Sequence, residues 1–494
     1  MQQTDSTFLT GSYARLPGHF FARLGPTPVI QPRLIKFNRA LAADLGLELN
    51  SLDAAALAEI FSGNRMLPGA DPIAMIYAGH QFGQFVPQLG DGRAILLGEV
   101  RDSNGTRRDI QLKGSGRTPF SRGGDGRAAV GPVLREYLVS EAMHALGIPT
   151  TRALAAVATG ESVLREQRVP GAILTRVAAS HVRVGTFQYF AARGDVDAAR
   201  LLADYVIERH YPALKLDARP HLALLRSVME RQARLIASWM HVGFIHGVMN
   251  TDNMTVSGET IDFGPCAFMD AYDPAAVFSS IDGYGRYAYA NQPQAAQWNL
   301  TRFAETLLPM IDSVPERAVE LASEVMATFA ARFAECWLAG MRRKLGLFGA
   351  EDGDLDLAEE LLDVMHRNQA DFTLTFRRLC DAAQNGEADA GLRALFADPS
   401  APDAWIGKWR SRLAREPQAA AAHAAAMRQV NPAYIPRNHR IEQAITAAVE
   451  SGDFSPFAEF LEVLSRPYEA RKDREDYANA PQPDERVLRT FCGT

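Results

Sequence analysis

The chain contains no run of about 18 uncharged apolar residues, so its sequence predicts no membrane-spanning helix. Its opening residues, MQQTDSTFLTGSYARLPGHFF, lack the basic and apolar segments of an export signal, and we therefore expect a soluble, cytoplasmic protein. Four cysteines are too few and too scattered for a disulfide scaffold or a zinc ribbon. An excess of basic residues is also absent: the net charge is −6, which argues against a general nucleic-acid coat.

What the sequence does contain is ordinary for a globular protein. The apolar fraction is 47% and the charged fraction 22%, values that exclude disordered and fibrous classes. The length of 494 residues exceeds the usual size of one compact domain, and no repeat of fixed period is visible. We therefore expect two lobes, or one domain with extensions. The sequence leaves the oligomeric state open, with a monomer favoured.

The order of local patterns predicts an α+β fold in which a small β-rich lobe precedes a large α-helical lobe. We expect an N-terminal extension packing on the first lobe at 1–75, the β-rich lobe at 76–180, the helical lobe at 181–440 and a C-terminal extension at 441–494. Alternation and turn signals predict strands at 94–100, 109–113, 151–159 and 171–177, with 84–113 forming an antiparallel meander.

Helical spacing of apolar residues predicts a helix over 34–46, and another from Pro132 to the stop signal at Gly147. A glycine-dense loop occupies 114–131. From about residue 195 the pattern is helical except at 244–270, with a turn at 351–354 and an alanine-rich helix at 413–428.

A pair of glycines lies between two expected strands, in the segment Leu89–Arg93 (LGDGR). Taken alone, such a pair is typical of a hairpin turn. It also fits a loop whose lack of side chains lets backbone amides approach phosphate groups. The segment by itself does not decide between the two interpretations.

Lys113 closes a predicted strand, and Glu136 lies near the start of the next helix. A strand lysine is usually a solvated edge residue, and a helical glutamate usually faces water. The helix can nevertheless bring its glutamate under the strand and hold the ammonium group towards a nucleotide phosphate. Glu141 lies off that helical face, so we select Glu136 as the partner.

Two further motifs follow in the helical lobe: HGVMNTDNM at 246–254 and Ile261-Asp262-Phe263-Gly264. The residues between them, 255–260, read as a hairpin. Asn253 and Asp262 supply an amide and a carboxylate oxygen, ligands that suit Mg²⁺ together with nucleotide phosphates. The two motifs therefore indicate a metal–nucleotide site.

A glycine loop, a strand lysine, a helix glutamate, His…Asn and Asp-Phe-Gly follow one another in the order found in protein kinases. One departure stands out, because the position of the kinase catalytic aspartate is Val248, which cannot accept a proton. The nearest carboxylate is Asp252, adjacent to Asn253. The sequence thus predicts either an inactive kinase-like chain or an enzyme with a shifted base.

Six longer segments resemble the selenoprotein-O family (SelO, YdiU-like): 77–94, 111–128, 173–187, 246–254, 261–270 and 431–439. The similarity runs from about residue 16 to the last few residues. It implies a two-lobed protein-kinase-like fold that binds ATP in an inverted orientation. It also implies a protein adenylyltransferase, which transfers AMP to hydroxyl side chains of target proteins with Mg²⁺, or UMP from UTP with Mn²⁺.

Carried over position by position, the resemblance implies a role for each matching residue. Lys113 and Glu136 form the phosphate clamp, Asp252 is the base, and Asn253 and Asp262 hold the metal, with Asp262 also contacting the nucleotide. The other implied nucleotide contacts are Gly90, Gly92, Arg93, Asp125, Gly126, Arg176 and Arg183. Arginines suit this task, because attack at the α-phosphorus builds charge on the departing β- and γ-phosphates.

One segment departs from the family pattern. Before the helix the family commonly has a basic residue and two hydroxyl residues, whereas this chain has Gly131, Pro132 and Val133. This places in question any phosphate or substrate contact from 131–133, although Arg127 and Arg135 are close by in sequence.

The cysteines divide into two pairs. Cys336 and Cys380 lie in apolar helical runs, which predicts small core residues. The resemblance implies that Cys266, just beyond Asp-Phe-Gly, and Cys492, near the C-terminus, form a redox-sensitive disulfide that tethers the tail across the site. The alternative is that Cys492 is a free thiol in the tail.

Two other functions fit the same motifs. A conventional γ-phosphotransferase is compatible with the fold and the metal motifs, and a pseudokinase scaffold is compatible with Val248 at the usual base position. Residues 431–439 (NPAYIPRNH) also fit a structural corner between the helical lobe and the tail. The target proteins are not identified by the sequence.

Overall fold

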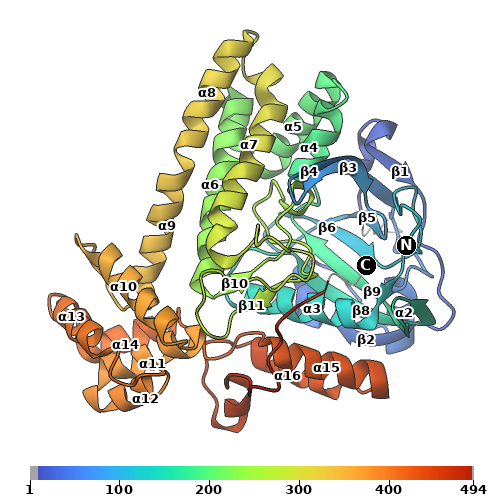
Figure 1. The fold of residues 1–494 in the computed structure, drawn as a ribbon. Helices are drawn as coiled ribbons and strands as arrows, with labels where there is room; N and C mark the ends of the chain where they lie inside the picture. The colour runs from blue at the N-terminus through green and yellow to red at the C-terminus, as the bar shows by residue number, and fades with distance from the viewer. Residues whose placement is uncertain (1–8, 50, 492–494) are drawn as a thin grey trace, which may run out of the picture.

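The computed structural model describes residues 9–49 and 51–491 of the chain. It has an α+β architecture in which an N-terminal antiparallel sheet is followed by a largely helical region (Figure 1). None of the helices in the described residues combines the length and apolar character needed to cross a membrane.

The sheet has nine strands, and all its pairings are antiparallel. The main path runs in the order β1-β3-β5-β6-β9-β8-β2, with β4 paired to β3 and β7 paired to β9. The strands are β1 (Phe21–Arg23), β2 (Arg33–Phe37), β3 (Ile73–Gln81), β4 (Gln84–Gly90), β5 (Ala94–Arg101), β6 (Arg107–Lys113), β7 (Ala128–Ala129), β8 (Arg152–Leu164) and β9 (Arg168–Ala178). The four strands expected at 94–100, 109–113, 151–159 and 171–177 are therefore present.

Two local predictions in this region were wrong. Residues 33–37 form strand β2, which pairs with β8, and only Arg39–Asp44 form a helix, α1, capped by Asn38. Pairing satisfies the backbone groups along the outer edge of β8, and this outweighs the helical spacing of the apolar residues. The meander is also interrupted, because β4 pairs with β3 and only β5 and β6 pair as expected.

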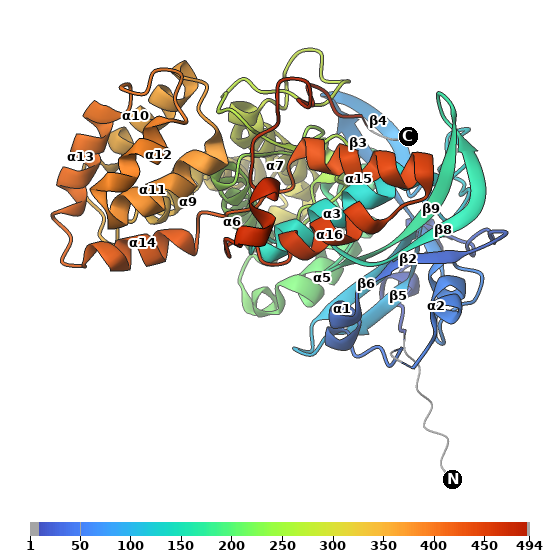
Figure 2. The ribbon, with the colours of Figure 1, turned by 90° about the horizontal axis from the view of Figure 1, so that it is seen from below.

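Helix α3 (Val130–Ala145) carries Glu136 beneath the sheet. It begins two residues before Pro132 and ends before Gly147, whose φ of +79° suits glycine at a helix C-terminus. Helices α15 (Asn438–Ser451) and α16 (Ser455–Leu464) pack on its far side (Figures 1 and 2). Buried on nearly all faces, α3 gives Glu136 a fixed position.

Helix α2 (Ala54–Phe61) packs against β2, β8 and β9 of the sheet. The remaining helices form the body of the second region and an appended group. They are α4 (Val184–Ala191), α5 (Val196–His210), α6 (Pro220–His241), α7 (Gln292–Ile311), α8 (Pro315–Ala327), α9 (Phe329–Lys344), α10 (Asp354–Arg367), α11 (Phe372–Gln384), α12 (Asp389–Arg393), α13 (Asp403–Leu413) and α14 (Ala420–Arg428). Helices α10–α14 gather at one end of the molecule around their own core, where Trp405 and Trp409 stack at 5.6 Å (Figure 2). The expected helix at 413–428 is broken, since Pro417 cannot continue α13.

The expected non-helical segment at 244–270 is present from Phe244 and carries the second set of motifs, but the next α-helix begins only at Gln292, so the prediction that helices resume after residue 270 was wrong. Strands β10 (Phe244–Ile245) and β11 (Ala267–Phe268) pair at its two ends and bring 246–264 together as a compact irregular loop. Residues 255–260 form a turn rather than a hairpin: Thr255 and Thr260 bridge to Arg183 and Thr150, respectively.

Candidate active site

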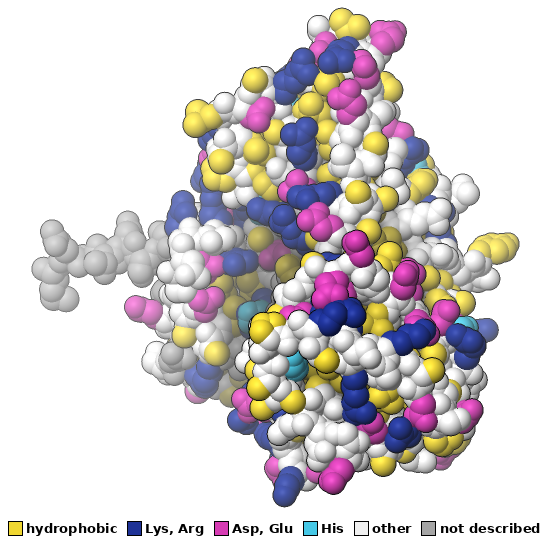
Figure 3. Space-filling model, turned by 90° about the vertical axis from the view of Figure 1, so that its left-hand side faces the viewer, with side chains coloured by type: hydrophobic (Ala, Val, Ile, Leu, Met, Phe, Trp, Pro, Cys, Tyr) yellow, Lys and Arg dark blue, Asp and Glu magenta, His cyan; other side chains and the backbone are white. Residues whose placement is uncertain are grey.

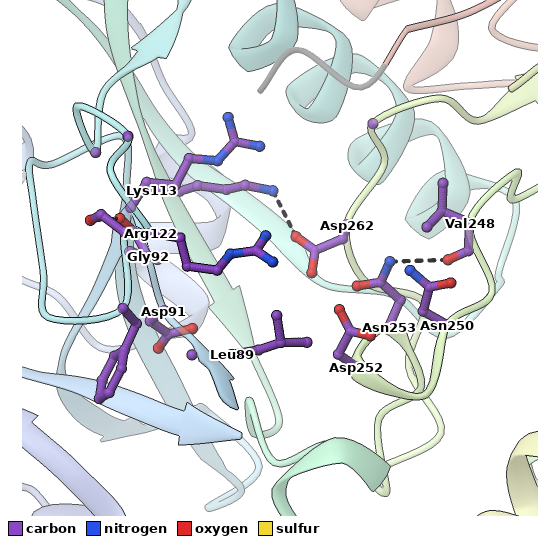
Figure 4. A pocket seen from close by; sticks show the side chains of 18 of the residues that line it. Leu89, Asp91, Gly92, Lys113, Arg122, Val248, Asn250, Asp252, Asn253 and Asp262 are labelled. Carbon is purple, nitrogen blue, oxygen red and sulfur yellow. Dashed lines mark hydrogen bonds and ion pairs between the residues drawn. The ribbon is translucent and has the colours of Figure 1, made fainter. Parts of the chain in front are cut away.

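A cavity of about 810 Å³ lies between the sheet and the 246–264 loop (Figure 4). This volume is within the range of small-molecule sites. Its lining includes most of the residues selected from the sequence: Gly90, Gly92, Arg93, Lys113, Asp125, Gly126, Arg176, Arg183, Asp252, Asn253 and Asp262. Segments distant in sequence thus meet at one pocket.

Lys113, at the end of β6, lies against two carboxylates. Its Nζ donates to Glu136 Oε2 at 2.6 Å and to Asp262 Oδ1 at 2.7 Å. The β6 strand points Lys113 towards the loop, and α3 presents Glu136 from beneath the sheet. The ammonium group is therefore fixed between the two halves of the protein.

Asp262 is surrounded by three cationic side chains. Besides Lys113, Arg176 Nη1 lies 2.6 Å from Oδ1 and Arg183 Nη1 lies 3.0 Å from Oδ2. Burial would raise the pKa of Asp262, but the three cations outweigh it and hold the pKa well below its ordinary value. Asp262 also has a φ of +62°, an uncommon backbone conformation for a non-glycine residue. It is thus a permanently ionised carboxylate held in a strained turn.

The two arginines differ in the hydrogen-bond donors that remain available to a ligand. Arg176 is 1% exposed, and its donors already reach Gln111 Oε1, Glu136 and Asp262. Arg183 Nε, in contrast, is buried without a hydrogen-bond partner, and its Nη2 has only a 3.9 Å contact with Asp91. Arg183 is therefore better placed to bind an anion, while Arg176 holds the carboxylates in place.

A buried relay behind Arg176 was missed in the sequence. Gln111 Oε1 accepts from Arg176 Nε at 3.2 Å and from Nη2 at 2.7 Å, while its Nε2 donates to Asp91 Oδ2 at 3.1 Å. Met75 N donates to the same Asp91 oxygen. Burial raises the pKa of Asp91, with Arg183 opposing the shift. Two signals could have identified the pair: Gln111 shares a strand face with Lys113, and Asp91 lies between the two selected glycines.

The glycine pair is required by a neighbouring loop. A Cβ at Gly90 would lie 2.5 Å from the Phe120 ring, and a Cβ at Gly92 would lie 2.8 Å from the Phe120 carbonyl oxygen. The loop at 118–126 therefore folds directly over the β4–β5 connection. Thr118 Oγ1 donates to the Asp91 carbonyl oxygen at 2.7 Å and fixes this packing. The glycines thus shape the pocket wall.

Asp125 and Gly126 lie in that loop, at the outer side of the pocket. Asp125 accepts from Arg165 Nη1 at 2.8 Å, and this bond lowers the pKa of Asp125. Gly126 has a φ of +70°, and a Cβ there would lie 2.1 Å from the Gly116 carbonyl oxygen, so only glycine fits. Both residues line the same cavity as the Lys113 cluster, as does Arg93.

Asp252 lies in the pocket on the side of the 246–264 loop and packs against the backbone of β3 (Figure 4). It is 7% exposed; Oδ2 accepts from Gln81 Nε2 at 3.3 Å, and Oδ1 has no hydrogen-bond partner. Burial raises the pKa of Asp252 to about 6, against the opposing charge of Arg183. A Cβ at Gly79 would lie 2.5 Å from Oδ1, so this glycine creates the space that Asp252 occupies.

Asn253 is oriented by the backbone of Val248. Its Nδ2 donates to the Val248 carbonyl oxygen at 3.0 Å, which fixes the amide and orients its oxygen (Figure 4). Across residues 9–49 and 51–491 there is no cluster of three or more His, Cys, Asp or Glu side chains that could hold a metal ion. The site therefore offers few protein ligands, all of them oxygens.

The three remaining sequence predictions concern 131–133 and the cysteines. Gly131 packs against α15, where a Cβ would lie 3.1 Å from Ile445, and the cavity lining does not include residues 131–133. Cys380 is buried as expected, whereas Cys336 is only half-buried, so the prediction of a core position for Cys336 was wrong. Cys266 is fully buried, and burial raises the pKa of its thiol to about 12. Cys492 lies outside the described residues.

The C-terminal segment nevertheless approaches Cys266. Thr490 N donates to the Phe278 carbonyl oxygen at 2.7 Å, and Thr490 Oγ1 donates to the carbonyl oxygen of Pro265, the neighbour of Cys266. The tail therefore contacts the loop that follows Asp262, and the contact is made by Thr490, two residues before Cys492 in the sequence.

Comparison with known proteins identifies the chain's relatives. A protein of Rhizobium meliloti (strain 1021) named protein nucleotidyltransferase YdiU is 65% identical over 483 residues, which cover 98% of both chains. Proteins of the same name from Rhizobium johnstonii and from Bradyrhizobium sp. (strain BTAi1) are each 66% identical, over 98% of this chain and 96% and 98% of their own. The family model described as protein adenylyltransferase SelO matches residues 4–465, and the chain therefore belongs to that family.

Proposed function

We propose that the pocket binds ATP and transfers its AMP group to hydroxyl side chains of other proteins, with release of pyrophosphate. As a member of the SelO family, the chain is a protein nucleotidyltransferase. One observation carries the assignment of the chemistry to this pocket: an ionised Asp262 held by three cations shares the cavity with Asp252, a buried carboxylate that has an unpartnered oxygen.

The cationic side supports binding of the outer phosphates. Lys113 and Arg183 present positive charge at the inner wall, and Arg183 Nη2 has only a distant contact, 3.9 Å, with Asp91. A triphosphate placed there has its β- and γ-phosphates against these groups and its α-phosphate nearer Asp252, the inverted orientation. Attack at the α-phosphorus moves negative charge onto the departing pyrophosphate, where fixed cations stabilise it most.

We assign proton transfer to Asp252. The acceptor oxygen forms a bond to the α-phosphorus, and the bond from that phosphorus to the oxygen bridging to the β-phosphate breaks. Pyrophosphate leaves with the bridging oxygen, and the hydroxyl proton moves to Asp252. The raised pKa of Asp252, about 6, makes it a stronger base than an exposed aspartate. Base catalysis of this kind typically contributes about 10²- to 10⁴-fold in rate.

Asn253 and Asp262 are the residues that would hold a divalent cation. Their oxygens, with the unpartnered Oδ1 of Asp252 beside them, suit Mg²⁺ or Mn²⁺. Such an ion takes its remaining ligands from phosphate oxygens and water, which agrees with the small number of protein ligands. When bound, it would neutralise phosphate charge. UTP with Mn²⁺ is an alternative pairing at the same residues.

We also propose that the fold is a two-lobed protein-kinase-like fold. The lysine–glutamate pair between sheet and helix, and the two motifs on the 246–264 loop, support this assignment. The proposed boundaries are the extension at 1–75, the N-lobe at 76–180, the C-lobe at 181–440 and the tail extension at 441–494. The proposed extension at 1–75 joins the N-lobe sheet through strands β1 and β2, which pair with β3 and β8, respectively.

A disulfide between Cys266 and Cys492 is proposed as a redox control of the site. The support is the position of Thr490 beside Pro265, which brings the tail to the Cys266 segment. The bond would tie the tail to the loop that follows Asp262.

Label placement tests the proposed reaction. With α-³²P-ATP we expect label on acceptor protein, with γ-³²P-ATP none, and we expect Asp252→Ala to reduce transfer by about 10²-fold or more. Asp197→Ala, at an exposed aspartate of α5, is the matched control. Transfer of γ label would instead indicate a phosphotransferase, and full α transfer by Asp252→Ala would remove the base assignment.

A further inference from the structure

The opening of the pocket beside Asp252 is formed by two segments that meet there. One is the β3–β4 connection, where Gln81 donates to Asp252. The other is the segment 279–288, which lies between β11 and α7 in the chain. Asn250 Oδ1 joins them, accepting from Phe82 N at 2.9 Å and from Tyr287 Oη at 2.9 Å. An acceptor hydroxyl that reaches Asp252 must pass these two segments.

Two arginines lie over one indole ring next to this opening. The Arg286 guanidinium carbon is 4.8 Å from the Trp298 ring centroid, and that of Arg302 is 5.1 Å away. Arg286 also reaches the β3–β4 connection, since a Cβ at Gly83 would lie 3.4 Å from its guanidinium. We call Arg286, Trp298 and Arg302 the basic rim. The aromatic ring holds both cations in place at one edge of the pocket mouth.

The basic rim has little negative charge to balance it. Within the described residues Arg286 has no carboxylate ion-pair partner, and Arg302 has only Glu305, whose side chain is 49% exposed. The Nε atoms of both arginines are buried without hydrogen-bond partners. Asp282 is the nearest acid in the 279–288 segment, and it accepts from the backbone nitrogens of 286 and 287 instead.

The strands beside the rim contribute mainly uncharged polar side chains. His80 and Gln81 lie at the end of β3 and Gln84 begins β4, and the His80 ring lies 5.1 Å from Trp298. By contrast, the face of the molecule on the side of α9–α14 carries basic and acidic side chains interspersed (Figure 3). Arg286, which has no ion-pair partner among the described residues, and Arg302, which is paired with Glu305, therefore form a local basic feature of a chain whose net charge is −6.

Exposed apolar and aromatic side chains occur on the 279–288 segment and on β4. Ile281 lines the cavity yet is 56% exposed, and Tyr284 at the tip of the same segment is fully exposed. Phe85 on β4 is 39% exposed and lies 4.9 Å from the His80 ring. These side chains offer contact area to a polypeptide, while the arginines offer charge.

We propose that the basic rim is the acceptor-docking surface, and that its partner is a protein segment with acidic residues next to the modified hydroxyl. This inference rests on the proposed function, because it takes Asp252 as the point that the hydroxyl must reach. Carboxylates of the acceptor bind the half-buried guanidinium groups of Arg286 and Arg302. Ile281 and Tyr284 pack against the acceptor backbone near the hydroxyl.

Two fluorescein-labelled peptides test the rim. Each carries one serine in an otherwise identical sequence, flanked by glutamates in one peptide and by glutamines in the other. Fluorescence anisotropy measures the binding of each peptide to the full-length protein. Transfer of label from α-³²P-ATP to each peptide is measured in parallel. We expect the glutamate peptide to bind about tenfold more tightly, with the difference shrinking as salt is raised. The net negative charge of the chain opposes this preference, so it cannot arise from overall attraction.

Variants locate the preference on the surface. We expect the double variant Arg286→Gln, Arg302→Gln to bind both peptides equally, with the loss appearing in the KM for peptide. Arg226→Gln, at an exposed arginine of α6, is expected to keep the preference. Thermal melting and binding of an ATP analogue report whether the double variant is folded.

Equal binding of the two peptides by the unaltered protein would overturn the proposal, as would a preference that survives in the double variant. Because peptide binding and AMP transfer are measured separately, a failure of the basic rim can be distinguished from a failure of the proposed function. Preferential, rim-dependent binding without α-label transfer would support the rim and contradict AMP transfer. Transfer of α label with no preference would contradict the rim alone.

Discussion

Removal of the Gln111 side chain amide tests the relay that holds Arg176. The change is Gln111→Leu, which keeps the size of the side chain and removes both polar atoms. Arg176 then loses the acceptor for its Nε and Nη2 donors, and Asp91 loses one of its donors. Because Arg176 is 1% exposed, water cannot replace the lost acceptor easily.

The expected magnitude follows from the burial and charge of the groups. Hydrogen bonds to charged groups contribute about 1.5–3 kcal/mol each, and a buried group left unsatisfied costs a similar amount. We therefore expect Gln111→Leu to lower the free energy of unfolding by about 3 kcal/mol. With Arg176 free to turn away from Asp262, we expect ATP affinity to fall by about 10²-fold, which corresponds to about 3 kcal/mol.

The assay combines urea unfolding with titration of a non-hydrolysable ATP analogue. Gln232→Leu is the matched control: Gln232 is also buried, on α6, and its Nε2 donates to the Thr255 carbonyl oxygen at 2.7 Å. Both variants should lose stability, but only Gln111→Leu should lose most of its nucleotide affinity. The reasoning is refuted if the two variants show the same change in affinity. Gln111→Glu adds a contrast, since it keeps an acceptor for Arg176 but places a second carboxylate beside Asp91.

Three further predictions concern other parts of the molecule. Gly79→Ala adds a Cβ 2.5 Å from Asp252 Oδ1, so we expect transfer to fall by about 10²-fold with the fold retained; unchanged transfer would show that Asp252 is not confined there. Burial lowers the pKa of Lys344 to about 7, so above that pH its amine is mostly neutral in the folded protein but stays charged in the unfolded chain up to about pH 10. The stability of the unaltered protein relative to Lys344→Met should therefore rise with pH from 7 to 10, by up to about 5 kcal/mol in urea titrations, and a flat difference would contradict this. Oxidised glutathione should oxidise Cys266 and Cys492 to a disulfide and be reduced to two glutathione thiols. Peptide mapping should then find the Cys266–Cys492 cross-link, and AMP transfer should fall and be restored by dithiothreitol. Two free thiols after oxidation would contradict the proposed disulfide.

The residues that are recognisable in sequence are those whose chemistry is local. Lys113 and Asp262 stand in short motifs with fixed spacing, and the structure brings them within 2.7 Å of each other. Glu136 could be selected over Glu141 from helical spacing, and it is the one that contacts Lys113. Glu141 instead accepts from Arg152, away from the pocket.

What could not be predicted depends on contacts between distant segments. Gln111 gains its role only when β6 pairs with β9, since that pairing places Arg176 directly opposite it. Strand β2 forms because β8 offers an unpaired edge, which the spacing of apolar residues within 34–46 does not reveal. The difference between Arg176 and Arg183 likewise depends on which donors their neighbours have already taken.

The orientation of the nucleotide tests the central claim most directly. The measurement is a structure of the protein with Mg²⁺ and an ATP analogue that cannot be cleaved between the α- and β-phosphates. We expect the β- and γ-phosphates against Lys113 and Arg183, with the α-phosphorus nearest Asp252. Adenine at the 179–183 connection between the sheet and the helical region, with the γ-phosphate nearest Asp252 and Arg183 without a phosphate contact, would contradict the account.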